Sequence, residues 1–213
     1  AETDASVQGA IGALAKFLAR KGARVSERAR PGFDFGEAHR VFIQLLRGAT
    51  SGRLGAEQFA KQLEARAGLD RDDQSYYAQM VRANTQPHKD WLAASNRRHQ
   101  MRRAWAEFFE EWDVLLCPNA ASAAFAHSIP GERWERMIPV NGKPQPATTQ
   151  MWWAGISGMC YLPGTAAPIG LSPGGLPLSV QIVGPQHGDL TTIGVARLIE
   201  REYYAFVPPP GCA

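Results

Sequence analysis

The sequence has few cysteines and lacks long apolar runs. Its three cysteines, Cys117, Cys160 and Cys212, are widely spaced and form no CxxC pair. An odd and sparse set favours a reducing compartment over a disulfide framework. The chain has no run of about 18 apolar residues that could span a bilayer, and its first residues show no charged-then-apolar signal segment. We therefore expect a soluble, cytoplasmic protein.

An excess of charge of one sign is also missing. The chain carries 23 basic and 20 acidic residues, a net charge of +3. This near balance argues against nucleic acid or a membrane surface as a partner. The 213 residues, 45% of them apolar, are enough for one sizeable domain. The sequence shows neither an internal repeat nor a clear linker, so we expect a single domain over residues 1–213.

Complete catalytic and metal-binding motifs are absent as well. The five histidines have neither HxxxH nor HExxH spacing, so we expect no metal site. No glycine-rich phosphate loop occurs, and we expect no cofactor. Ser157 lies in a Gly-Ile-Ser-Gly run that fails the GxSxG pattern, and no lysine has SxxK spacing. A triad of Ser157 with His127 or His187 and Asp189 can be written, but any chain with several serines allows such a set.

The N-terminal half predicts mainly helices. Apolar residues recur from Val7 to Leu18 at helical spacing, after the capping residues Thr3, Asp4 and Ser6. A glycine stop follows, and then Ala23–Glu27 predicts a short strand. Further helices are predicted at Phe35–Leu46, Ala56–Ala67, Gln74–Asn84 and Lys89–Trp112.

The C-terminal half predicts strands and a hairpin. Asp113–Pro118 is an apolar run closed by proline, typical of a buried strand in a parallel or mixed sheet. Residues 118–142 form a long loop, which is either functional or a plain connector. Thr165–Leu171 and Leu176–Val183 flank a Ser-Pro-Gly-Gly turn and predict a β-hairpin. A last helix is predicted after Asp189.

Paired tryptophans precede this hairpin among small residues. Large flat side chains with room around them can form either a pocket wall or an ordinary core. We favour a pocket for Trp152 and Trp153, because two neighbouring aromatics are costly to bury on both sides, and we leave Ile156 and Cys160 open. The candidate substrate-binding residues are Trp152, Trp153, Ile156 and Cys160. Gln181, in the second strand, could polarise a substrate carbonyl or make a hydrogen bond at the ladder edge.

Four segments resemble the C-terminal part of the amidase signature family. They are Asp4–Pro31, Trp105–Pro118, Met151–Pro168 and Gly174–Glu200. The fourth is the most specific, because GLP, VQIVGP, Asp189 and a helix to Glu200 follow in the family's order. Ser179 stands where the family often has glycine, which exchanges one small residue for another. The resemblance implies an α/β fold with a mixed β-sheet flanked by helices on both faces.

The resemblance also implies hydrolysis of a carboxylic amide C–N bond by a Ser–cis-Ser–Lys triad. That triad lies in a Gly/Ser-rich region N-terminal to these segments, and no GGSSGGS-like stretch occurs here. No catalytic residue can therefore be assigned to this chain. We expect an incomplete C-terminal part that supplies substrate pocket and scaffold and is not active alone.

The expected partners are the N-terminal catalytic half, on the same or a separate polypeptide, a small amide substrate, and a second copy of the chain. Two alternatives remain. The chain could be a non-catalytic subunit or remnant that binds a partner polypeptide, or a Ser-His-Asp hydrolase that uses Ser157. The sequence does not define which amide is the substrate.

Overall fold

The computed structural model describes residues 2–127, 131–209 and 211, and the chain divides into two compact units. Ala1–Arg30 and Ala106–Ala213 form the first, which we call the sheet unit. Pro31–Trp105 forms the second, the helical unit. The expectation that both act as one domain of a larger fold stays a prediction.

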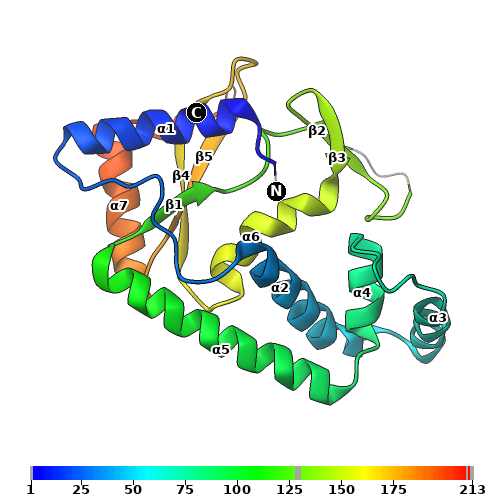
Figure 1. The fold of residues 1–213 in the computed structure, drawn as a ribbon. Helices are drawn as coiled ribbons and strands as arrows, with labels where there is room; N and C mark the ends of the chain where they lie inside the picture. Colours follow the sequence, from blue (N-terminus) through cyan, green and yellow to red (C-terminus); the bar gives the residue numbers. More distant parts are fainter. Residues whose placement is uncertain (1, 128–130, 210, 212–213) are drawn as a thin grey trace. The chain divides into compact units, whose positions relative to one another are not determined.

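The sheet unit is built on three antiparallel strands (Figure 1). They are β1 (Leu115–Pro118), β4 (Gly164–Leu171) and β5 (Pro177–Val183), in the order β1-β5-β4. The predicted hairpin is therefore confirmed, and so is the α/β fold class. The pairings among the described strands are all antiparallel. β1 lies at an edge of this sheet, where only its Cys117 is buried, and not at the fully buried position that its apolar run predicted.

Turn chemistry closes the β4–β5 hairpin as its sequence predicts. The Gly175 N–H donates to the Ser172 carbonyl over 2.9 Å, and the Ser172 N–H donates to the Leu176 carbonyl over 2.8 Å. Gly175 has a φ of 77°, which glycine adopts at little cost. The hairpin places β5 in the middle of the sheet.

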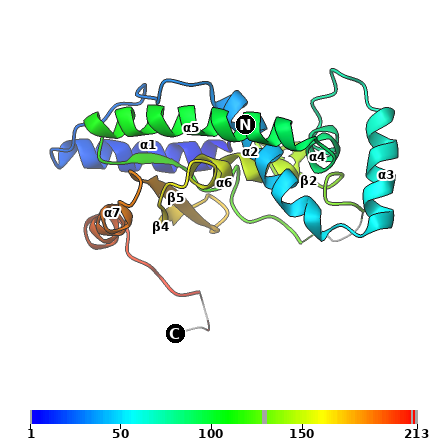
Figure 2. The ribbon, with the colours of Figure 1, turned by 90° about the horizontal axis from the view of Figure 1, so that it is seen from below.

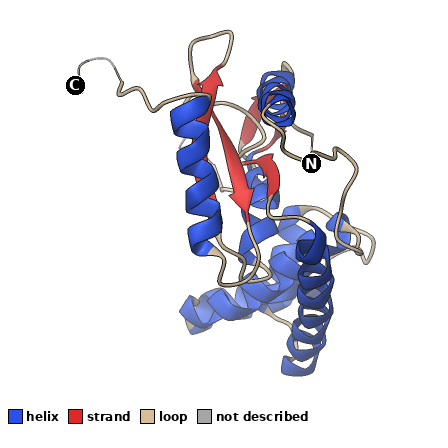
Figure 3. Cartoon of the chain, turned by 90° about the vertical axis from the view of Figure 1, so that its left-hand side faces the viewer, coloured by secondary structure: helices blue, strands red, loops and turns tan. Residues whose placement is uncertain are grey.

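Helices cover both faces of this sheet. α1 (Ala5–Arg20) and α7 (Asp189–Glu202) pack on one face (Figures 1 and 3). Alternate residues of β5, namely Leu178, Val180 and Ile182, join Val7 and Leu14 of α1 and Ile199 of α7 in the core. The opposite face, to which Gln181 points, carries α6 (Gln150–Gly158). Burial of each such apolar side chain contributes about 1.5–3 kcal/mol before entropy is counted.

Two predictions in the sheet unit were wrong or incomplete. Ala23–Glu27 is exposed irregular chain and not a strand. The described residues offer it no neighbouring strand, and instead Arg24 donates to the Glu111 carbonyl and lies 4.2 Å from the Trp112 ring centroid. The end of the long loop and the residues after it form a second hairpin that the sequence did not predict, β2 (Met137–Val140) with β3 (Lys143–Pro146). A short 3-10 turn at Ala147–Thr149 follows.

The helical unit consists of the predicted helices, of which α3 has its predicted bounds and the others have shifted ends (Figure 2). They are α2 (Phe35–Thr50), a 3-10 turn (Ser51–Arg53), α3 (Ala56–Ala67), α4 (Tyr76–Asn84) and the first part of α5 (His88–Glu111). α2 and α3 each contact α4, and Arg97 of α5 binds Glu37 of α2 through both carboxylate oxygens. The apolar stripe of α3 is not buried, because Phe59 and Leu63 are 37% and 47% exposed.

No helix within the described ranges is long and apolar enough to cross a membrane.

Candidate functional site

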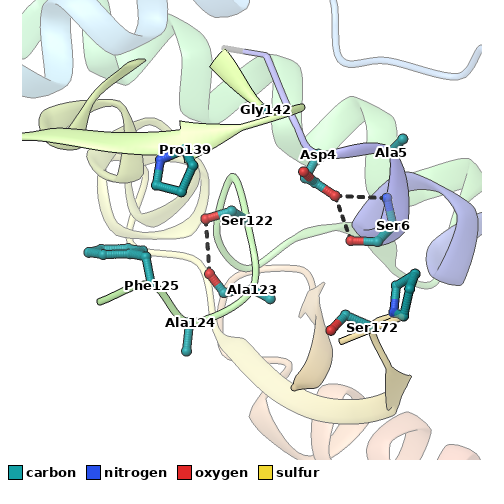
Figure 4. A pocket seen from close by; sticks show the side chains of 11 residues that line it. Asp4, Ala5, Ser6, Ser122, Ala123, Ala124, Phe125, Pro139, Gly142 and Ser172 are labelled. Carbon is teal, nitrogen blue, oxygen red and sulfur yellow. Dashed lines mark hydrogen bonds between the residues drawn. The ribbon is translucent and has the colours of Figure 1, made fainter. Parts of the chain in front are cut away.

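A hollow of about 630 Å³ in the sheet unit is the candidate site (Figure 4). We call it the Ser122 hollow, and it is lined by Asp4, Ala5, Ser6, Ser122, Ala123, Ala124, Phe125, Pro139, Gly142, Ser172 and Pro173. Four pieces of chain form it: the start of α1, the loop after β1, the β2–β3 hairpin and the tip of the β4–β5 hairpin. Its size lies in the range of about 300–1,000 Å³ that is usual for small-molecule pockets.

Small side chains keep this space open. The loop after β1 reads Asn-Ala-Ala-Ser-Ala-Ala-Phe from Asn119 to Phe125. The Ser122 hydroxyl donates to the Ala123 carbonyl over 2.9 Å, so it makes a local bond and does not cross the hollow. A second hollow of about 190 Å³ shares Ser122, Ala123 and Ala124 and extends along β5. The loop is thus a thin wall between two spaces.

One buried residue, Ala121, anchors this wall from two sides. Its carbonyl accepts from the Asp4 N–H over 2.7 Å, and its own N–H donates to Gln150 Oε1 over 2.8 Å. Ala121 packs with Ile138 and Val140 of the β2–β3 hairpin, and Trp153 packs against the same cluster. The position of the wall therefore depends on α1 and on α6.

Asp4 is the only charged side chain among the described residues that line the hollow. Its Oδ1 accepts from the Ser6 hydroxyl over 2.6 Å and from the Ser6 N–H over 3.0 Å. Its Oδ2 accepts from the Asn141 N–H over 3.0 Å. The Ser6 hydroxyl, followed by the Asn141 N–H, lowers the pKa of this carboxyl below its ordinary value. Asp4 therefore stays ionised at neutral pH.

None of the four residues predicted to bind substrate lines the Ser122 hollow. Trp152, Trp153 and Ile156 lie on α6, and Cys160 follows it. Ile156 and Cys160 are buried, at 8% and 0% exposed, while the tryptophans are partly buried. Trp153 supports the wall through its contact with the Ala121 cluster. Direct substrate binding by these residues stays a prediction.

Gln181 has a role that the sequence did not show. Its side chain is buried, and its Oε1 accepts from the Ser157 hydroxyl over 2.9 Å. Its Nε2 donates to the Trp153 carbonyl over 3.0 Å and lies 3.5 Å from Cys117 Sγ. Both ends of the carboxamide are thus used to hold α6 on the central strand. Neither sequence-based alternative for Gln181, a substrate carbonyl or the ladder edge, describes this arrangement.

Burial makes the neighbouring thiol unreactive. It raises the pKa of Cys117 to about 12, so the group stays neutral and is no nucleophile near neutral pH.

The hydrogen bond of Ser157 argues against the Ser157 triad. Its hydroxyl donates to the Gln181 carboxamide, which cannot take a proton, and not to His127 or His187, the two bases that the triad offered. His127, His187 and Asp189 are exposed. Among the described residues, no group of three His, Cys, Asp or Glu side chains could hold a metal ion.

The Ser122 hollow was not predicted from the sequence, although two sequence features indicate it. The loop at 118–142 was long enough to be functional, and its run of small residues directly follows a strand. The fold class, the hollow and the β4–β5 hairpin together define an α/β protein with a candidate small-molecule site at the loop end of a strand.

The family model for amidase matches residues 1–193, and the chain belongs to this family. It is similar to a subunit of the glutamyl-tRNA(Gln) amidotransferase of Parvibaculum lavamentivorans, with 35% identity over 118 residues that cover 52% of this chain and 20% of that protein. It is also similar to the indoleacetamide hydrolase of Bradyrhizobium diazoefficiens, with 25% identity over 206 residues that cover 93% of this chain and 35% of that protein.

Solved structures show the same fold. A bacterial aryl acylamidase of the amidase signature family matches with a TM-score of 0.67 and 18% identity, over 98% of this chain and 44% of that chain. The chain therefore spans less than half the length of these relatives. The resemblance of the four sequence segments to this family is confirmed.

Proposed function

We propose that this chain forms the substrate-pocket and scaffold part of an amide hydrolase, and that the Ser122 hollow receives part of the amide. The observation that carries the proposal is the hollow itself, because a space of about 630 Å³ opens in the unit that holds the amidase-like hairpin. The names of the relatives support amide chemistry, since one hydrolyses indoleacetamide and another belongs to an amidotransferase.

The serines around the hollow are not equipped for catalysis alone. The Ser6 hydroxyl donates to Asp4, and the Ser122 hydroxyl donates to a backbone carbonyl. Ser172 accepts from the Leu176 N–H. A serine nucleophile needs a base within hydrogen-bond reach, and these bonds supply none. We therefore assign nucleophile and base to an N-terminal catalytic half, on the same or a separate polypeptide, that works with this chain in the cytoplasm.

Exposed apolar side chains support such a partner. Leu190, Ile193 and Leu198 of α7 are 84%, 40% and 48% exposed. β4, on which α7 packs, is an outer strand of the described sheet. An outer strand beside an apolar helix face is a usual place for further chain to pair and pack. The second candidate function, a non-catalytic subunit that binds a partner polypeptide, rests on the same surface.

Ammonia release from phenylacetamide and indole-3-acetamide tests the proposal. We expect release by the native protein that contains the N-terminal half, and none by the 213-residue chain alone. Equal rates from the isolated chain would contradict the division of roles. If the chain forms a stable complex with the N-terminal half and this complex releases no ammonia, the second candidate function, a non-catalytic subunit, is favoured.

Size-exclusion chromatography with the dye ANS tests the need for a partner. We expect the isolated chain to bind the dye or to self-associate. A monodisperse monomer that binds no dye would contradict that need.

A further inference from the structure

The described lining of the Ser122 hollow contains a negatively charged side chain and no positively charged one. Its other ten described residues are alanines, serines, prolines, a glycine and a phenylalanine, all uncharged, so that among the described lining residues the charge is that of Asp4. No arginine, lysine or histidine in the described part of the chain lines the space. A carboxylate bound here would therefore meet hydroxyls and apolar groups, but no cation to pair with.

The negative charge is held in place by its neighbours. Ser6 and Asn141 bind the two oxygens of Asp4, and the carboxylate also caps α1. A second carboxylate lies at the same end, because Glu2 accepts from the Asn141 and Gln145 side chains over 2.8 and 2.9 Å. The positive end of α1 offsets part of this charge, by about half a unit. The two carboxylates together exceed this half charge.

We propose that Asp4 is a specificity-determining residue, which makes the Ser122 hollow accept amides whose bound part is neutral or cationic and disfavour amides that carry a carboxylate there. This inference rests on the proposed function. It narrows the open range of substrates, because acylated amino acids with a free carboxylate near the bound part become poor ligands, whereas aryl and alkyl amides remain good ones.

Asp4 offers a test in which the cap of α1 is kept while the bond from the Asn141 N–H is lost. Asparagine and serine cap helices about as well as aspartate, so Asp4→Asn and Asp4→Ser remove the charge and keep a capping side chain. A matched control is Asp34→Asn in the helical unit, because Asp34 caps α2 through the Glu37 N–H over 2.7 Å and lines no part of the Ser122 hollow.

The measurement is initial-rate kinetics of ammonia release by the native protein from three amides at low salt, with the KM of each amide as the readout of its binding. The three probes are phenylacetamide, its 4-carboxylate and its 4-aminomethyl derivative. A single charge at about 4–6 Å in a wet site changes affinity by about three- to fivefold. We expect the wild-type protein to prefer phenylacetamide over the carboxylate by about that factor, and both Asp4 variants to bring the ratio close to one. Asp34→Asn should leave the ratio unchanged, and added salt should shrink it.

The outcomes separate this inference from the proposed function. If phenylacetamide binds but the ratio is the same in wild type and both Asp4 variants, the inference is overturned and the pocket assignment stands. If none of the three probes binds, both are overturned. A lower ratio in Asp4→Asn and Asp4→Ser, with Asp34→Asn like wild type, supports Asp4 as the residue that sets the charge preference.

Discussion

Each unit of the chain contains a hollow, but the polar groups around the two hollows do different work. The hollow in the helical unit, of about 270 Å³, is lined by Arg40, Gln44, Arg66, Gln74, Gln79, Arg82, Ala83, Gln86 and Asp90. Arg82 donates to the carbonyls of Asp70, Arg71 and Asp73, and Arg66 donates to the carbonyl of Thr85 over 2.6 Å. The long arginine side chains around this hollow thus hold loops and a helix end in place through hydrogen bonds to backbone carbonyls.

The Ser122 hollow has the opposite character. Its lining is short, its hydroxyls bond locally, and its single charge is fixed by Ser6 and Asn141. The long side chains around the helical-unit hollow are extended to backbone carbonyls, whereas the small residues around the Ser122 hollow leave space for a ligand. The comparison therefore favours the sheet unit as the place where substrate binds.

The largest expected effect concerns the support of the sheet-unit wall. Gln181→Leu removes the acceptor of the Ser157 hydroxyl and a side-chain donor to the Trp153 carbonyl, in a partly buried place. We expect a loss of about 3 kcal/mol in the free energy of unfolding, measured by urea denaturation. The double variant Ser157→Ala/Gln181→Leu should regain part of it, since one orphaned group is removed. Equal stability of wild type and Gln181→Leu would show that α6 is held by other contacts.

The next effect tests the structural role of the arginines in the helical unit. Arg82→Ala removes the donor to the carbonyls of Asp70, Arg71 and Asp73, which shape the connection between α3 and α4. Hydrogen bonds from a charged donor are worth about 2 kcal/mol, so unfolding should become easier by about that amount. Arg53→Ala is the control, because Arg53 is exposed and lies outside this hollow. Similar stability of the two variants would contradict a fastening role.

A smaller effect is expected when a larger side chain fills the Ser122 hollow. Ser122→Phe should fill the hollow and weaken phenylacetamide binding by about tenfold, while the unfolding midpoint changes little because only a local hydrogen bond is lost. Ala60→Phe, at an exposed position on α3, is the control and should bind like wild type. If Ser122→Phe bound the probe with unchanged affinity, the hollow would not be the binding site.

A further expected effect separates the two units by the pH dependence of their stability. Burial lowers the pKa of His39 in the helical unit to about 4, below the ordinary value of 6.5. A lowered pKa means that the unfolded state takes up the proton first, so this stability is present above about pH 6.5 and is lost as the pH falls toward 4. In the sheet unit the raised pKa of Cys117 works the other way, and its contribution is lost as the pH rises from about 9 to 12.

Hydrogen exchange at pH 7 and pH 4.5 checks the first of these shifts. We expect α2 to lose protection at the lower pH, and His39→Gln to reduce that change. His99→Gln, at an exposed position on α5, should behave like wild type. The same loss of protection in both variants would exclude His39 as its source.

Local signals in the sequence predicted much of this fold. The helix at Ala56–Ala67 has its predicted bounds, and the Ser-Pro-Gly-Gly turn places the β4–β5 hairpin correctly. These elements depend on spacing, caps and turn residues, which neighbouring residues supply. The segment Ala23–Glu27 shows the limit, because a strand also needs a partner that the same residues do not encode.

The candidate site was harder to predict for a related reason. α6 contains Gly155, Ser157 and Gly158, which are weak helix formers. Gln181, far away in the sequence, holds the helix through Ser157 and the Trp153 carbonyl. The Ser122 hollow likewise arises where four separate segments meet. Hydrogen bonds and hollows between distant segments cannot be predicted from the residue pattern of a single segment.

The central claim is that an amide binds in the Ser122 hollow, and a crystal structure of the native protein soaked with phenylacetamide tests it most directly. We predict density for the ring between the loop Ser122–Phe125, the start of α1 and the tip of the β4–β5 hairpin, with no ligand in the arginine-lined hollow of the helical unit. Density for the probe in the helical-unit hollow, with the Ser122 hollow empty, would contradict the account.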